Sequence, residues 1–252
     1  METVFVDGDC VVVNKAPGES SEPLCSPSMT SLPRLLGERL GGPFFTVHRL
    51  DVPVSGCVLF ARNRDALAFL GRAFAEHSEG KGGEGGIKKM YWAVTEMPGR
   101  EIPQSGELVH WIKAGPSKSA AFDEDGPGRK RAALRYRIAG KGDRYLFLEI
   151  ELLTGRRHQI RAQLARLDLH IKGDLKYGAR RSEKGGGIRL HARSLSFPVF
   201  KTGETVTVYA PPPPSAPGGL PDSLWRAFEE SAGTRACPGN FAEGETPRQA
   251  PR

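Results

Sequence analysis

Short apolar runs, several of them alternating with polar residues, predict most of the β-strands of this chain. Two pairs of runs are separated only by brief polar turns, Asp-Gly-Asp at 7–9 and Lys-Gly-Asp at 141–143, and each pair predicts a β-hairpin. The predicted strands are a hairpin within residues 3–15 and single strands at 56–62, 88–96, 132–140, 144–153, 188–199 and 204–210.

Apolar residues recur with helical spacing in a smaller number of segments. In residues 64–78 the recurring residues are Ala66, Phe69, Leu70, Ala73 and Phe74, the spacing of an amphipathic helix. Ile160, Leu164 and Leu167 mark a second stripe in residues 154–170, where Thr154 is the predicted N-cap. Two shorter helices are predicted at 31–40 and 220–230.

The predicted strands outnumber the helices, and hairpins outnumber strand–helix–strand units. We found no internal repeat, no GxGxxG loop and no Walker loop, so the nucleotide-binding α/β folds lose support. The expected class is α+β, with a mixed, mainly antiparallel central sheet and flanking helices. Loops are predicted at 16–33, at 79–86, where glycine dominates, and at 113–131, which is basic.

Composition divides the chain into two parts. Residues 1–210 carry the predicted sheet, whereas 211–252 are rich in Pro, Gly and charge apart from the short helix, and the last ~15 residues are expected to be disordered. No apolar run reaches the ~18 residues of a membrane helix, and the N-terminus resembles no signal or transit peptide. The expected compartment is the cytoplasm.

Charge points to a polyanionic partner. The net charge of +7 and the pI near 9.4 favour nucleic acid, although many basic proteins bind none. The basic clusters are Lys88-Lys89, 129–131, Arg135 with Arg137, Arg156-Arg157, Arg161 and Arg180-Arg181. The four cysteines, Cys10, Cys25, Cys57 and Cys237, have no metal-site spacing, so we expect idle thiols and no metal.

Polar residues crowd the approach to the predicted strand at 56–62. His48, Arg49 and Asp51 precede it, and Pro53 with Ser55-Gly56 predicts a bend. A single Asp at a bend is often only a turn-forming residue, because its side chain bonds the local backbone. That explanation leaves the neighbouring cation and imidazole unexplained, so Asp51 is a candidate catalytic carboxylate.

A second polar concentration is the segment TGRRHQIR, at 154–161. On a helix that begins near Gly155, Arg157 and Arg161 share a face, and His158 neighbours Arg161. Arg161 lies beside the apolar stripe, so its guanidinium either reaches water along its stem or pairs with a carboxylate.

Two further residues are open to a structural or a chemical reading. Tyr91 and Trp92 are neighbours in the strand at 88–96, so they face opposite sides and at least one is expected inside. His191 is expected to be a packing histidine, since no partner residue marks it.

Several of these segments together resemble the RluA-type family of RNA pseudouridine synthases. The similar segments follow the family order within residues 3–210 and are 11–18, 47–56, 89–94, 151–178 and 190–197. HRLD and TGRRHQIR together are far more specific than either motif alone. The resemblance implies a basic cleft across the sheet and the isomerisation of uridine in RNA to its C-glycoside, without metal or cofactor.

The resemblance also implies roles for individual residues. Asp51 corresponds to the essential aspartate, Tyr91 to the active-site tyrosine, and Arg161 to the basic residue that pairs with the aspartate. Arg49 corresponds to the arginine that displaces the target base. His48, Arg157 and His158 are candidate RNA or base-flipping contacts, and the residues at 129–131 and 180–181 are candidate contacts to the RNA backbone. The base that removes the C5 proton stays open.

Some features depart from the family pattern. Val54 stands where the family usually has Thr or Ser, and the proline of NKAPG is shifted. Many relatives carry an N-terminal S4 domain, for which we expect no room here. A monomer is the family-based expectation, and ribosomal and transfer RNA are both open as substrates.

Two other functions are compatible with parts of the sequence. One is an RNA-binding or ribosome-assembly module without catalysis, against which the joint presence of Asp51, Tyr91 and Arg161 argues. The other is a hydrolase that uses Asp51 and His48, but the sequence offers no second placed carboxylate and no oxyanion motif.

Overall fold

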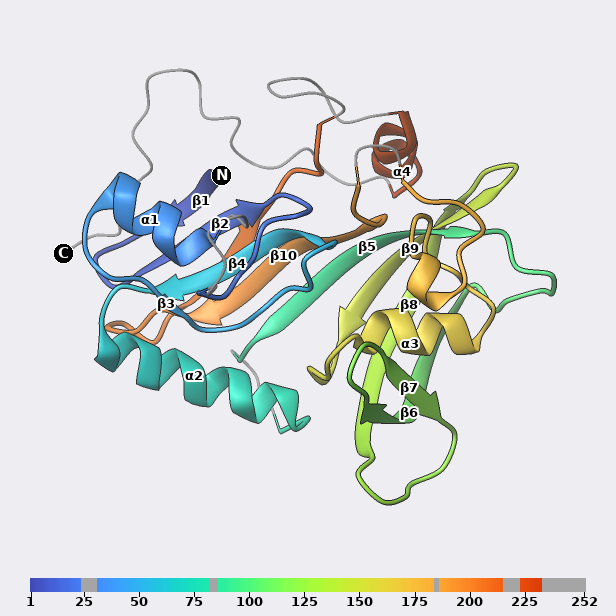
Figure 1. Ribbon diagram of the computed structural model, residues 1–252, viewed down its shortest axis with the longest axis horizontal. Coiled ribbons are helices and arrows are strands. Elements are labelled where there is room, and N and C mark those ends of the chain that lie inside the picture. Colours follow the sequence, from blue (N-terminus) through green and yellow to red (C-terminus); the bar gives the residue numbers. More distant parts are fainter. Residues whose placement is uncertain (24–30, 82–85, 184–185, 215–222, 233–252) are drawn as a thin grey trace.

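The computed structural model describes residues 1–23, 31–81, 86–183, 186–214 and 223–232. In this part of the chain one sheet of eleven strands runs through the molecule (Figure 1). The strands are β1 (Glu2–Val6), β2 (Cys10–Lys15), β3 (Phe45–Thr46), β4 (Ser55–Ala61), β5 (Lys88–Glu96), β6 (Ser105–Ala114), β7 (Ser119–Phe122), β8 (Lys130–Lys141), β9 (Tyr145–Leu152), β10 (Leu190–Pro198) and β11 (Thr205–Tyr209).

The order of strands confirms the expected class. The sheet runs β1-β2-β4-β10-β5-β9-β8-β6-β7, with β3 beside β4 and β11 beside β10. All pairs are antiparallel except β4 with β10. Both predicted hairpins form, β1–β2 and β8–β9.

Four α-helices cover the two faces of this sheet. They are α1 (Leu32–Leu40), α2 (Arg64–Ser78), α3 (Gln159–Arg166) and α4 (Ser223–Ala232), and one 3-10 turn, η1, spans Leu175–Tyr177. α1 and α3 pack into one core with alternate residues of β2, such as Val11 and Val13. Leu70 of α2 packs on the opposite face with Val12. The core thus lies in layers on both faces of the sheet.

Glycine at position 56 allows the only parallel pairing in the described sheet. β10 passes so close to β4 that a Cβ on Gly56 would lie 2.3 Å from the carbonyl oxygen of Ala192, and Gly56 has φ +113°. A residue with a side chain fits neither the space nor the backbone conformation. The pairing sets the beginning of β4, and with it the turn before β4, beside β10 and β5.

The predicted bend forms before β4, with Asp51 at its first position and Pro53 within it. It lies at 51–54, where the Val54 N–H donates to the Asp51 carbonyl, whereas Ser55 and Gly56 already belong to β4. Three other local features differ from the prediction. The segment 113–131 is not one loop, because it contains β7 and the ends of β6 and β8. β6 was not predicted at all, since His110 occupies one of its inward positions and interrupts the apolar alternation.

The third error concerns the helix predicted at 154–170, because α3 covers only Gln159–Arg166. Thr154 is not its N-cap, since His158 stands there, with the left-handed φ of 55°. The helix stops at Leu167, after which Asp168 has φ 63°. Arg157 therefore lies outside the helix that carries Arg161.

The helices at 31–40, 64–78 and 220–230 are confirmed to within a few residues. Predictions for parts of the loops at 16–33 and 79–86, for residues 220–222 and for the last ~15 residues fall outside the described residues.

Candidate active site

Asp51 lies at the first position of the turn that leads into β4. The side chain of Lys15, which is fully buried, stabilises this turn through hydrogen bonds. Its ammonium donates to the carbonyls of Val52 and Val54 at 2.9 and 2.6 Å, and to that of Ala16 at 3.0 Å. Three donors thus meet three acceptors, which fixes the backbone on which Asp51 stands while its side chain remains 25% exposed.

Arg161 reaches Asp51 from the first turns of α3. Its Nη1 donates to Oδ2 of Asp51 at 2.8 Å, which confirms that the arginine at the edge of the core has a carboxylate partner. A second carboxylate holds the other side of the same guanidinium. Nε and Nη2 of Arg161 donate to the two oxygens of Asp174 at 2.7 and 2.8 Å, and Asp174 is 1% exposed.

The electrostatics of this triad follow from its burial. Burial of Arg161 opposes its positive charge, but hydrogen bonds and attraction to Asp174, and then to Asp51, outweigh that cost, so the pKa of Arg161 is raised. A guanidinium with one bidentate partner has little rotational freedom. Arg161 therefore presents its remaining amine to Asp51 as a fixed, fully charged donor.

His158 approaches Asp51 from the residue before α3. Its Nε2 lies 3.5 Å from Oδ2 of Asp51, and its Nδ1 is 2.9 Å from the hydroxyl of Tyr177, which also bonds the backbone of Ser119. Burial lowers the pKa of His158, and the attraction of Asp51 offsets only part of that effect. His158 is therefore neutral at pH 7 and can direct an Nε2–H towards the carboxylate.

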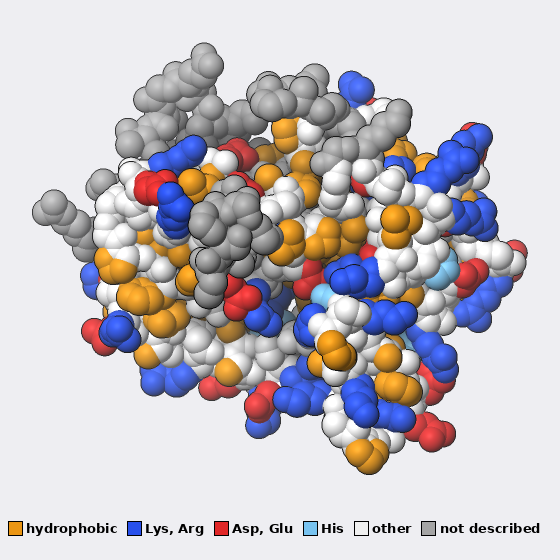
Figure 2. Space-filling model, in the orientation of Figure 1, with side chains coloured by type: hydrophobic (Ala, Val, Ile, Leu, Met, Phe, Trp, Pro, Cys, Tyr) orange, Lys and Arg blue, Asp and Glu red, His pale blue; other side chains and the backbone are white. Residues whose placement is uncertain are grey.

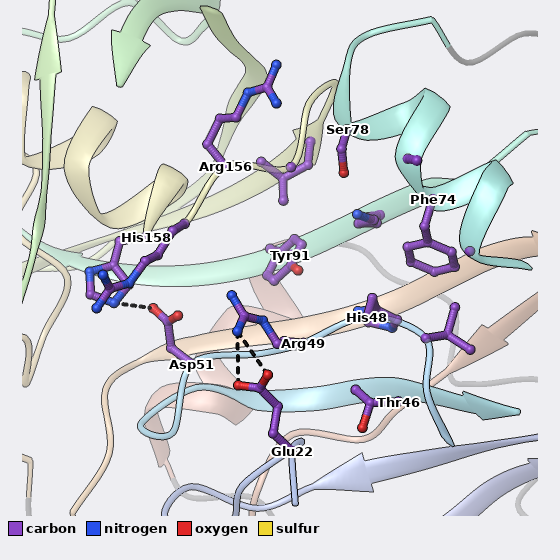
Figure 3. A pocket seen from close by; sticks show the side chains of 17 residues that line it. Glu22, Thr46, His48, Arg49, Asp51, Phe74, Ser78, Tyr91, Arg156 and His158 are labelled. Carbon is purple, nitrogen blue, oxygen red and sulfur yellow. Dashed lines mark hydrogen bonds and ion pairs between the residues drawn. The ribbon is translucent and has the colours of Figure 1, made fainter. Parts of the chain in front are cut away.

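Tyr91, which belongs to β5, lines a hollow beside Asp51. The hollow has a volume of about 480 Å³, within the range of small-molecule sites, and Asp51 and Tyr91 both line it. In Figure 3, Tyr91 lies between Asp51 and His158 at one end and Phe74 and Ser78 of α2 at the other. Burial, and secondarily the charge of Asp51, raises the pKa of Tyr91, so its phenol is neutral.

Arg49 lies at the mouth of this hollow and is more than half exposed. Its Nη1 contacts both carboxylate oxygens of Glu22 at 3.0 Å, a contact that Figure 3 shows. An ion pair this exposed contributes about 0–1 kcal/mol, so the side chain can leave Glu22 at little cost.

Two of the candidate RNA contacts also form contacts within the protein. His48 is stacked on Phe74, with ring centroids 4.6 Å apart, and its Nε2 accepts the Leu59 N–H at 3.2 Å. Burial lowers the pKa of His48 well below its usual range. Since His48 is engaged with Leu59, a hydrolase built on His48 and Asp51 loses support.

Arg157 donates to the carbonyls of Gly115 and Pro116 at 2.7 and 3.2 Å, while its side chain stays exposed. It joins the loop before α3 to the turn between β6 and β7. Arg157 lines the hollow as predicted, but it shares no helix face with Arg161.

The hollow carries more positive than negative side chains. Figure 2 shows Lys and Arg side chains and a histidine around its opening near the middle of the molecule. Its cations are Arg49, Lys89, Arg156 and Arg157, and its carboxylates are Glu22 and Asp51. A second hollow of about 540 Å³ meets it at Asp51 and adds Lys176 and Arg161. The clusters at 129–131 and 180–181 are largely exposed.

Further features concern possible metal ligands, membrane spans, the cysteines and His191. Among the described residues, no three His, Cys, Asp or Glu side chains are grouped so that they could hold a metal ion. No helix in the described ranges is long and apolar enough to cross a membrane. Cys10 and Cys57 are buried, and Cys25 and Cys237 lie outside the described residues. His191 is buried and bonds Ser55 and Ala210, as a packing histidine does.

Sequence reasoning missed three residues that shape the site, namely Lys15, Asp174 and Tyr177. Asp174 and Tyr177 lie inside the similar segment 151–178, but no role followed from the motif alone. The sequence did give a reason to expect a second acceptor for Arg161, because a buried guanidinium has five N–H donors and one carboxylate cannot satisfy them all. Lys15 gave no such signal, since its burial depends on packing that the local sequence does not reveal.

Comparisons with known proteins identify the family of this chain. The model of a family described as RNA pseudouridylate synthase matches residues 9–166. An uncharacterized RNA pseudouridine synthase of Zymomonas mobilis is 31% identical over 221 residues, which cover 83% of this chain and 93% of the relative. The tRNA pseudouridine synthase C of Haemophilus ducreyi is 27% identical, with 83% and 90% covered.

A solved structure shares the fold. The human RNA pseudouridylate synthase domain containing 4 superimposes with a TM-score of 0.67 over 92% of each chain, at 20% identity.

Proposed function

Because the chain belongs to the family of RNA pseudouridine synthases, whose members isomerise uridine in RNA, we propose that it modifies uridines of ribosomal or transfer RNA through the carboxylate of Asp51. The observation that carries the proposal is the fixed contact between Arg161 and Asp51 beside Tyr91 in one hollow. The name of the Haemophilus relative supports transfer RNA as one substrate class. We assign this activity to residues 1–210.

The reaction needs few groups, all of which the hollow offers. The bond from C1′ to N1 of uracil breaks, the ring turns, a bond from C1′ to C5 forms, and the C5 proton finally leaves while N1 gains one. No electron is gained or lost, so a carboxylate suffices as the nucleophile or as the base that starts the cleavage. Nη1 of Arg161 holds the carboxylate of Asp51 in position while bound RNA excludes water from it.

Tyr91 is proposed to lie against the uracil ring and to direct its hydroxyl at C5. No hydrogen bond of this hydroxyl joins it to another described residue, and Tyr91 is 7% exposed, so its hydroxyl is available to a ligand in the hollow. Since its raised pKa keeps the phenol protonated, Tyr91 can take the C5 proton only if it passes its own proton on in the same step.

Arg49 is proposed to fill the place that the target base leaves. The base must leave its stack to reach Asp51, which costs a few kcal/mol. Arg49 is exposed at the mouth of the hollow, and among the described residues its side chain forms an ion pair with Glu22 alone, so it can exchange that partner for RNA. Arg156 and Arg157 along the first hollow and Lys176 along the second would then hold the phosphates on either side of the target uridine.

Release of tritium from RNA tests the proposal. RNA labelled with 5-³H-uridine, prepared from cells that lack the gene, is incubated with the protein, and tritium in water is counted. The C5 hydrogen is lost only when the new bond to C5 forms, so an active synthase releases tritium, and mapping of pseudouridine then identifies the sites. Binding of this RNA without any release would instead support an RNA-binding module.

A further inference from the structure

Lys89 is a buried cation of the hollow that the account of Asp51 does not use. It lies two residues before Tyr91 on β5, so both side chains leave the same face of the strand, with Cα atoms about 7 Å apart. Its side chain lines the hollow that also holds Asp51, yet the residue is only 8% exposed. Lysine is rarely buried to this degree without a partner.

The ammonium of Lys89 has no anionic partner in the described part of the chain. It forms no ion pair and no hydrogen bond there, and it lies over the ring of Phe74, whose centroid is 4.9 Å away. Burial lowers the pKa of Lys89 to about 8, and no carboxylate counteracts this. The nearby His48 and His77 are neutral, because burial, and then the charge of Lys89, lowers the pKa of each. The positive charge is therefore uncompensated.

The ammonium of Lys89 and the hydroxyl of Ser78 converge beside the backbone of Gly155, where the space is narrow. A Cβ built on Gly155 would lie 3.4 Å from Nζ of Lys89 and 2.7 Å from Oγ of Ser78, so a side chain at position 155 would displace the serine hydroxyl and crowd the ammonium. Ser78 and Gly155 line the same hollow as Lys89. The hydroxyl of Ser78 likewise has no hydrogen bond to another described residue, and Figure 3 shows Ser78 at the end of the hollow away from Asp51.

We propose that Lys89, with Ser78 at the same end of the hollow, binds a phosphate group of the substrate RNA next to the target nucleotide. This proposal rests on the proposed function, since it names a contact of the same substrate in the same hollow. A buried ammonium and a hydroxyl that converge on one space suit a phosphate oxygen, and a phosphate supplies the charge that Lys89 lacks. The subsite would fix the distance between the RNA backbone and Asp51.

The chain offers a matched set of variants. Lys89→Met removes the charge, and Gly155→Ala keeps the charge but fills the space. Gly155 has no left-handed φ and its nearest neighbour is the end of a serine side chain, so the added methyl is expected to be tolerated. Lys88→Met is the control, because Lys88 is the exposed neighbour on the same strand.

The first measurement uses inorganic phosphate as the probe and needs no turnover. Protein grown with ¹³C-lysine is titrated with phosphate, and the Cε signal of Lys89 is assigned by its absence in Lys89→Met. We expect the Lys89 signal to shift as phosphate is added until the site is saturated, and the pKa of Lys89 to rise. In Gly155→Ala the apparent affinity for phosphate should fall at least tenfold. A Lys89 signal that responds no more than that of Lys88, or that Gly155→Ala leaves unchanged, would overturn the proposal.

The second measurement uses unfractionated transfer RNA at several salt concentrations. Lys89→Met should reduce the slope of log affinity against log salt by about one, and Lys88→Met should leave it unchanged. An equal slope in the wild type and Lys89→Met would count against the subsite. If phosphate binds at Lys89 but no tritium is released from RNA, the proposed function fails and the subsite stands. If tritium is released but Lys89 does not respond to phosphate, the subsite fails and the proposed function stands.

Discussion

At the scale of single residues, the site depends on how Arg161 is held. Its guanidinium is 4% exposed and is clamped by Asp174 on one side, so only one amine remains for Asp51. The sequence predicted the contact to Asp51 through the family resemblance. It did not predict the contact to Asp174, because Asp174 is 13 positions after Arg161 and the chain returns to the helix only at the turn around η1.

Replacement of Arg161 by Met should impair both folding and turnover. Asp174 would be left as a buried unpaired carboxylate, which costs about 3–5 kcal/mol of unfolding free energy. Loss of the fixed donor to Asp51 should reduce the rate by about 10²–10³-fold. Urea unfolding and tritium release measure the two effects.

The double variant Arg161→Met with Asp174→Asn separates them. Without the buried charge, part of the lost stability should return, while activity should stay low because Asp51 still lacks its partner. Wild-type turnover in either variant would refute a role for the ion pair.

At the scale of elements, the sequence predicted most strands and helices but misjudged where α3 begins. Residues 154–158 form a loop that is tied to β8 rather than a first helical turn. Oγ1 of Thr154 accepts the Ala133 N–H at 2.9 Å, and the Gln159 side chain bonds Thr154, Arg156 N–H and the Ala133 carbonyl. Capping statistics favour Thr before a helix, but here the partners come from a strand 21 residues away, which local sequence cannot indicate.

Thr154→Val should therefore destabilise the protein although Val has nearly the same shape. The buried N–H of Ala133 would lose its acceptor, at a cost of about 1–3 kcal/mol. His158 and Arg161 follow directly in the chain, so turnover should fall as well. Thermal unfolding measures the change in stability, and Thr154→Ser, which keeps the hydroxyl, is the control. Equal melting temperatures for Thr154→Val and the wild type would argue against a stabilising role of the hydrogen bond between Thr154 and Ala133.

At the scale of the whole molecule, the site lies where the two halves of the sheet meet. The close pairing of β4 with β10, which Gly56 permits, places the turn that carries Asp51 next to β5. α3 approaches this turn from the part of the sheet that contains β8 and β9. The family resemblance predicted a cleft there, but residue spacing alone did not, because the segments at 51, 91 and 161 are brought together only by the order of the strands.

Three buried histidines should make the whole fold sensitive to acid. Burial lowers the pKa of His77 to about 4 and that of His191 to about 3, and it lowers that of His48 well below its usual range. In the unfolded chain each takes up a proton near pH 6.5. Below that pH the unfolded state binds more protons, so the free energy of unfolding falls, by about 2 kcal/mol per histidine at pH 5.

Melting temperatures between pH 7.5 and 4.5 measure this effect. His191→Gln can keep the bonds to Ser55 and Ala210 but takes up no proton, so its melting temperature should fall less steeply with acid. Equal slopes for the variant and the wild type would mean that His191 does not contribute.

The most direct measurement compares wild-type protein with Asp51→Asn on the same 5-³H-uridine RNA. Asn keeps the size of Asp51 and can still meet Arg161, but it is neither a nucleophile nor a base. We predict tritium release and pseudouridine with the wild type, and RNA binding without either product with the variant. Full activity of Asp51→Asn would contradict the assignment of the reaction to this carboxylate.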